Sequence, residues 1–167
     1  MGVVGRQPDF ATWYEMERPA LYATLAAITG DRAIAQDAAD EALARAFERW
    51  PRVSLMESPA GWTYVTALNL VRRRAHRRGL EQRALGRFAR RAASDPAEDL
   101  GLRLEVREAL EALPPAARTV AALYYVADRP VAEIAATLGI SIGTVTSTLT
   151  TARVRLRRAF VEGEVPA

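Results

Sequence analysis

The chain has 167 residues, 50% hydrophobic and 26% charged, which is enough for one ordinary domain or two small ones with buried cores. It has no cysteine and a single histidine, His76. This composition excludes disulfides, thiolate metal sites and cysteine nucleophiles, and leaves little material for a histidine-based metal site or catalytic relay. The net charge of +3 is uneven, with −3 over residues 1–70, +8 over residues 71–93 and −2 over residues 94–167. A basic block behind an acidic front predicts two different partners, one of them a polyanion.

Nothing in the sequence is typical of membrane targeting. The N-terminus lacks the long apolar core of a signal peptide. The longest mostly apolar run, residues 20–28, is far shorter than the roughly 20 residues that span a bilayer. We therefore expect a cytoplasmic protein with no direct membrane insertion.

Apolar residues recur with helical spacing and strand signals are almost absent, which predicts an all-α fold. The first helix is expected from Asp9 to Ile28, with Pro19 bending or splitting it. A second helix is expected from Asp31 to Trp50, stopped by Pro51. Its inward stripe contains Ile34, Ala38, Ala42, Ala46 and Phe47.

A third helix is expected from about Ala60 into an arginine run that ends at Arg78, with Trp62, Val65, Leu68 and Val71 on its apolar line. Residues 79–101 are rich in arginine and alanine and then in turn-forming residues, so they are interpreted as a partly helical, poorly packed linker. The sequence thus predicts two small helical domains, residues 9–78 and 102–160. In the second, helices are expected over residues 104–113 and 116–126.

The strongest functional signal is the segment from Val131 to Leu149. A short helix ends at Gly139, where a tight turn needs a left-handed residue, and Ser141 can cap the next helix. The inward stripe of that helix is Val145, Leu149, Ala152, Leu156 and Phe160. The pattern predicts a helix-turn-helix whose second helix enters the DNA major groove; a plain helical hairpin is the alternative.

Taken in order and spacing, these features resemble the extracytoplasmic-function sigma factors of bacteria over residues 9–160. The acidic helix of that family, A-E-D-L-V-Q-E-A-F-L-R-A-W, is similar to residues 35–47. Its proline, tryptophan, asparagine and basic run are similar to Pro59, Trp62, Asn69 and residues 72–78, and its L-P-x-x-x-R motif is similar to residues 113–118. The helix-turn-helix matches over residues 133–145. The chain departs from the family at Asp40, Leu43 and three recognition-helix threonines, Thr146, Thr148 and Thr151.

The resemblance implies an RNA polymerase sigma factor that directs promoter recognition and transcription initiation, with no catalytic residue, cofactor or metal. Its partners would be the polymerase core, promoter DNA and an anti-sigma factor. Residues 9–78 would act as sigma region 2, on the core and the −10 element, and residues 102–160 as region 4, on the −35 element. Core binding would involve Asp37, Asp40 and Glu41. The residues implied in DNA binding are Trp62, Asn69, Arg72, Arg73, Arg74, Ser141, Thr144, Thr146, Ser147, Thr150, Arg153 and Arg157.

Each of these residues also has a simpler interpretation. Trp62 and Tyr64 could stack on flipped bases, but Trp62 lies on the apolar line, which favours a core residue. Asn69 could bond a base edge or a neighbouring carbonyl. The arginine run would hold phosphates, whereas the acidic residues and the polar edge of the last helix could serve solubility alone.

Three other functions are compatible with parts of the sequence. A helix-turn-helix regulator that never joins the polymerase would account for residues 102–160 but not for the acidic helix. A nucleotide-directed enzyme would need convergent groups beyond Asp37 and Glu41, which lie one helical turn apart. A protein-binding adaptor would show no salt-sensitive binding to DNA.

Overall fold

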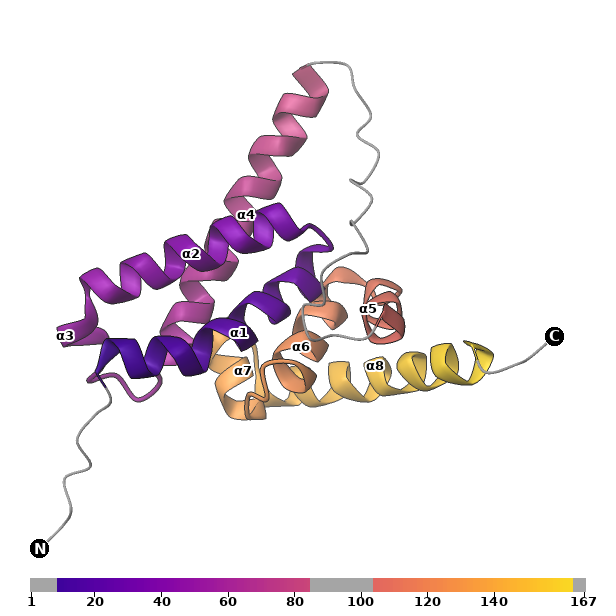
Figure 1. Ribbon diagram of the computed structural model, residues 1–167. Helices are drawn as coiled ribbons and strands as arrows, with labels where there is room; N and C mark the ends of the chain where they lie inside the picture. Colours follow the sequence, from indigo (N-terminus) through magenta and orange to yellow (C-terminus); the bar gives the residue numbers. More distant parts are fainter. Residues whose placement is uncertain (1–8, 85–103, 164–167) are drawn as a thin grey trace, which may run out of the picture.

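The computed structural model describes residues 9–84 and 104–163 (Figure 1). Over these residues the chain forms eight helices and no strand, which confirms the all-α prediction. The front half contains α1 (Phe10–Thr29), α2 (Arg32–Glu48), α3 (Trp50–Val53) and α4 (Pro59–Ala84). The back half contains α5 (Leu104–Glu111), α6 (Pro115–Tyr125), α7 (Val131–Leu138) and α8 (Ile142–Gly163).

Local capping signals set the ends of the first two helices. The Asp9 and Asp31 carboxylates accept hydrogen bonds from the backbone N–H groups of Thr12 and Ile34, at 2.9 and 3.0 Å. Between the two helices, Gly30 adopts a left-handed conformation with φ 62°. Pro19 was expected to bend or split the first helix, but α1 is assigned as one helix through it.

The third predicted helix is longer than expected. The Ser58 hydroxyl accepts a hydrogen bond from the Gly61 N–H at 2.8 Å, just where Pro59 begins α4. From there α4 continues past Arg78 to Ala84, into the segment predicted as a linker, and its end projects away from the other helices (Figure 1). The rest of that predicted linker, residues 85–101, lies outside the described residues.

In the back half, Arg118 is a buried structural residue. Its guanidinium donates to the carbonyls of Leu110, Glu111 and Leu113 at 3.0, 2.6 and 3.1 Å. These carbonyls lie at the end of α5, where a helix leaves its last acceptors without partners. The L-P-x-x-x-R pattern therefore fixes the junction between α5 and α6.

The helix-turn-helix forms as predicted. Gly139 ends α7 with φ 66°, and the Ser141 hydroxyl accepts from the Thr144 N–H at 3.0 Å at the start of α8. The two helices are bent by 109° at this break, in the range usual for the motif. Among the described residues no single helix is long and apolar enough to cross a membrane, although α7 and α8 taken together pass the same test of length and composition.

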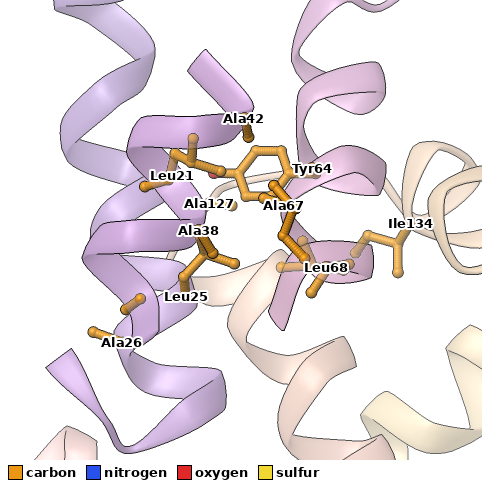
Figure 2. Close-up of a cluster of buried hydrophobic side chains, with 14 of the residues drawn as sticks. Leu21, Leu25, Ala26, Ala38, Ala42, Tyr64, Ala67, Leu68, Ala127 and Ile134 are labelled. Carbon is orange, nitrogen blue, oxygen red and sulfur yellow. The ribbon is translucent and has the colours of Figure 1, made fainter. Parts of the chain in front are cut away.

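The two halves share one buried core. Leu21 and Leu25 of α1 and Tyr64 and Leu68 of α4 belong to the same cluster as Ile134 of α7 (Figure 2). A second cluster joins α1 to α5, α6 and α8 around Ala27, Leu110, Ala121 and Ala152. Region 2 and region 4 of the sequence prediction are thus packed directly on one another.

Three predicted inward residues face outward, because neighbouring helices cover other parts of the helix surface. Phe47 is 64% exposed, and Phe160 and Val65 are exposed as well. On α4 the buried aromatic residue is Tyr64, which is 1% exposed, so the structure is at odds with its interpretation as a base-stacking residue. Trp62 is partly buried against the core.

Candidate nucleic-acid and polymerase interfaces

The acidic helix α2 presents carboxylates on its outer face. Asp37 and Asp40 are exposed, while Ala38 and Ala42 on the opposite side are buried against α1 and α4. This division follows from the small residues that recur every fourth position and let the helices approach closely. The two aspartates are available to a basic partner.

Glu41, the third predicted docking residue, is held by two arginines. Its Oε1 accepts from Arg45 at 2.5 Å and its Oε2 from Arg74 at 2.7 Å. The hydrogen bond from Arg74 lowers the pKa of Glu41 below its ordinary value, helped by the charge of Arg45 and opposed by burial. Glu41 therefore braces α2 against α4, and it is still partly exposed on the same surface as the two aspartates.

The arginine run divides between two faces of α4. Arg74 and Arg78 turn toward α2, where they pair with Glu41 and Asp31. Arg72 and Arg73 are exposed, and Arg72 donates to the Asn69 amide oxygen at 3.4 Å. Residues three and four apart lie on one helix face.

The outward face of α4 therefore runs from apolar to basic. We call it the α4 strip, and it consists of Trp62, Val65, Asn69, Arg72, Arg73 and Arg77. The structure thus brings four predicted DNA-binding residues together and places a fifth, Arg74, on another face. The strip also contains Arg77 and Val65, which the site prediction did not include. Each lies four residues from a predicted residue, Arg73 or Asn69, and that spacing is the signal that could have added them.

A groove of about 600 Å³ adjoins the start of the α4 strip. Met56, Trp62 and Val65 line one side, and Pro130, Ala132 and Ala136 of the back half line the other. The two sides are joined by the Ser58 hydroxyl, which donates to Glu133 Oε1 at 2.6 Å. The loop over residues 54–58, between α3 and α4, is therefore in contact with the first helix of the helix-turn-helix.

On α8 the predicted recognition residues are exposed, while Val145, Leu149 and Ala152 are buried. Thr146, Ser147 and Thr150 each donate their hydroxyl hydrogen to a backbone carbonyl of α8, at 2.9 to 3.1 Å. Arg153 is held sideways, because its Nε donates to the Tyr125 hydroxyl at 2.8 Å. This surface is rich in hydroxyl and methyl groups, with its cations toward the C-terminal end.

Two family models match this chain, the model of sigma-70 region 2 over residues 13–81 and the model of sigma-70 region 4 over residues 103–156. Together they span the acidic helix, the α4 strip and the helix-turn-helix in the order expected. The RNA polymerase sigma-E factor of Streptomyces coelicolor is 27% identical over 164 residues, which is 98% of this chain and 93% of the relative.

The chain belongs to the extracytoplasmic-function sigma factors.

Solved structures agree with this assignment. The sigma factor RpoE of Bartonella quintana, in complex with the anti-sigma factor NepR, superimposes with a TM-score of 0.77 at 25% identity, covering 91% of this chain and 96% of that one. CnrH, in complex with the cytosolic domain of CnrY, has a TM-score of 0.62 at 19% identity, covering 96% and 92%, and this likeness concerns the fold.

As an extracytoplasmic-function sigma factor, the protein directs RNA polymerase to promoters and initiates transcription. Its partners are the polymerase core and promoter DNA. The helix-turn-helix regulator that never joins the polymerase is not favoured, because such a protein needs no region 2.

The two regions of this sigma factor are joined by a polar network that the sequence did not reveal. Arg129, just before α7, donates to Glu17 Oε2 of α1 at 2.5 Å and lies 3.7 Å from Glu133. Its guanidinium also lies 5.3 Å from the ring centre of Tyr64. Burial raises the pKa of the Tyr64 phenol above its ordinary value, which favours the neutral ring.

Proposed function

We propose that the sigma factor docks on the polymerase core through the outer face of α2. The supporting observation is that Asp37 and Asp40 are exposed with no ion-pair partner among the described residues, whereas Glu41 is engaged by Arg45 and Arg74. Phe47 lies on the same face, two helical turns beyond Asp40, and is 64% exposed. Charge would steer the encounter, and the exposed ring would provide the apolar anchor that stable interfaces need.

The docking proposal is tested by measuring the affinity for purified core polymerase. Asp37→Asn combined with Asp40→Asn should weaken binding, and Phe47→Ala should weaken it further, mainly by faster dissociation. A matched control, Glu15→Gln with Glu108→Gln, removes two exposed carboxylates elsewhere and should bind normally. Equal binding by both double variants would remove the α2 face from the interface.

We propose further that promoter DNA is contacted at two places. One is the α4 strip with the loop over residues 54–58, and the other is the exposed side of α8. On the α4 strip, Trp62 and Val65 offer apolar surface for unstacked bases and the arginines offer phosphate contacts. On α8, contacts would come from Ser141, Thr144, Thr146, Ser147, Thr150, Arg153 and Arg157. Arg74 would act indirectly by holding α4 against α2.

The α4 contact predicts a change in salt dependence. With core polymerase present, Arg72→Gln with Arg73→Gln should weaken open-complex formation on all promoters and reduce the salt slope by about two ionic contacts. Arg18→Gln with Arg49→Gln removes two other exposed arginines and serves as the control. An unchanged slope would mean that the strip is a solvated face.

We also propose that the protein acts in the cytoplasm with the polymerase, has no catalytic activity of its own and is held in check by an anti-sigma factor. In its favour, the related RpoE was solved with NepR. The groove beside Trp62 would bind an apolar surface of the anti-sigma factor. Because residues of both regions line this groove, one bound partner would contact region 2 and region 4 together. A purified antagonist should inhibit run-off transcription. Ala136→Asp, which changes the groove outside the proposed DNA contacts, should relieve that inhibition; full inhibition of the variant would place the contact elsewhere.

A further inference from the structure

The opening turns of α8 contain no side chain that can read guanine or adenine by a paired hydrogen bond. From residue 141 to residue 152 the sequence is Ser-Ile-Gly-Thr-Val-Thr-Ser-Thr-Leu-Thr-Thr-Ala, without charged, amide or imidazole groups. In a helix-turn-helix these are the positions that reach base edges. The paired contacts of arginine or lysine with guanine, and of asparagine or glutamine with adenine, are therefore absent from this part of the helix.

One edge of α8 is instead a ridge of branched side chains. Ile142, Thr146, Thr150 and Val154 follow one another at intervals of four residues, so they lie along one side of the helix. All four are exposed, Ile142 by 55% and Val154 by 48%. We call this edge the methyl ridge.

The two threonines of the methyl ridge turn their hydroxyl hydrogens toward the helix. Thr146 Oγ1 donates to the carbonyl of Ile142 at 2.9 Å, and Thr150 Oγ1 donates to the carbonyl of Thr146 at 3.0 Å. A threonine bonded in this way has used its donor. What it offers a partner is its γ-methyl group and the remaining acceptor capacity of its oxygen.

Methyl groups and acceptor oxygens match a particular set of base edges. In the major groove thymine alone carries a C5-methyl group, and the amino groups of adenine and cytosine are donors. An exposed apolar ridge would ordinarily suggest a protein partner. Here the same helix continues into the exposed residues Arg155, Arg157 and Arg158, which complement a phosphate backbone.

We propose that α8 reads its promoter element through the C5-methyl groups of thymines, contacted by Ile142, Thr146 and Thr150, rather than through paired hydrogen bonds to guanine. This inference rests on the proposed binding of α8 to DNA, and it names the chemistry of the element bound. Position-specific recognition then depends on apolar contact in the groove, while the arginines near the end of the helix supply affinity without base preference.

The test uses the sigma factor bound to core polymerase and an upstream element found by selection from random DNA. Each thymine of that element is replaced in turn by deoxyuridine, which pairs identically and lacks only the C5-methyl group. Burial of one carbon group contributes about 0.8 kcal/mol, which corresponds to roughly fourfold in binding. We expect this loss at one or more thymines, and a loss at none would overturn the proposal.

Two substitutions at one position separate methyl contact from hydrogen bonding. Thr146→Val keeps the branched shape and removes the hydroxyl, whereas Thr146→Ser keeps the hydroxyl and removes the methyl group. We expect the valine variant to keep the preference for thymine over deoxyuridine, and the serine variant to lose it at one position. The reverse result would assign recognition to the hydroxyl and refute the methyl ridge.

A further control distinguishes this inference from the proposed function. Promoter DNA cut off before the upstream element is compared with full-length DNA. If both are transcribed equally, α8 does not bind DNA in the complex and the proposed function fails at this site. If the upstream DNA matters but deoxyuridine has no effect at any position, only the thymine-methyl inference fails.

Discussion

Replacing Arg129 with alanine should loosen the contact between regions 2 and 4 without unfolding either. Arg129 lies at the seam between α1, α4 and α7, with a side chain that is 18% exposed. The substitution removes its hydrogen bond to Glu17 and its contact with the Tyr64 ring. It also leaves Glu17, 21% exposed, without its cation.

The size of the effect follows from these contacts. A hydrogen bond between charged groups contributes about 1.5–3 kcal/mol, and a cation over a partly buried ring about 0.5–2 kcal/mol. Because water still reaches both charged side chains, we expect a combined loss of about 2–3 kcal/mol. At about 1.4 kcal/mol per factor of ten, the balance between packed and separated regions should shift roughly 30- to 150-fold toward separation.

The chain has no cysteine, so single cysteines can be introduced for fluorescent labels. Gln36 on α2 and Thr151 on α8 are exposed and suit this purpose. Energy transfer between the labels should fall in Arg129→Ala and stay unchanged in Arg155→Ala, which removes an exposed arginine of α8. Circular dichroism should show the same helix content in all variants. Unchanged energy transfer in Arg129→Ala would refute the assigned role of this residue.

Other predictions concern single residues of the fold. Gly139→Ala should lower the free energy of unfolding by about 1–2 kcal/mol from backbone strain alone, because φ is +66° and no atom lies near the added methyl group. Gly143→Ala, inside α8, should be neutral or stabilising. Equal melting temperatures of the two variants would contradict this. Ile134→Ala should cost about 2–5 kcal/mol in denaturant unfolding, and a loss below 1 kcal/mol would show that the shared core is loosely packed. Glu41 has a pKa below its ordinary 4.5, so its pairing with Arg74 stabilises above that pH and is lost as the pH falls through the folded value. At pH 7 the Glu41→Gln variant should have a slightly lower melting temperature than wild type, and its free energy of unfolding should be lower by at most about 1 kcal/mol. In acid the two melting temperatures should be equal.

Local features of the sequence predicted the elements and their order well. The caps at Asp9 and Asp31, the left-handed glycine at Gly139 and the Ser141 cap are governed by residues within a few positions of one another. Errors occurred where burial depends on neighbours distant in the chain. Phe47 is apolar and follows the helical spacing, yet its only ring contact among the described residues is with Phe10 of α1, 5.0 Å between ring centres, and most of the side chain stays exposed.

For the candidate sites too, some features could be predicted from the sequence and others required the structure. The residue types and spacing of the acidic helix, the arginine run and the helix-turn-helix could be read from the chain alone. The chain alone did not show which arginines face outward. Arg74 and Arg78 are turned toward α2 by Glu41 and Asp31, which lie 33 and 47 residues away. The sequence likewise could not show that threonine hydroxyls on α8 bond their own backbone, because exposed side chains choose between local acceptors and water.

The sequence by itself determined that this sigma factor is helical, has two regions and carries a helix-turn-helix, because periodicity, caps and turns act over short distances. Only the tertiary structure decided that Tyr64 is buried at the seam, that Arg129 joins Glu17 to the ring, and that Ser58 is bonded to Glu133. These contacts link residues separated by 65 to 112 positions. These contacts depend on how the packed surfaces of region 2 and region 4 fit each other, and the sequence of one region alone does not specify that fit.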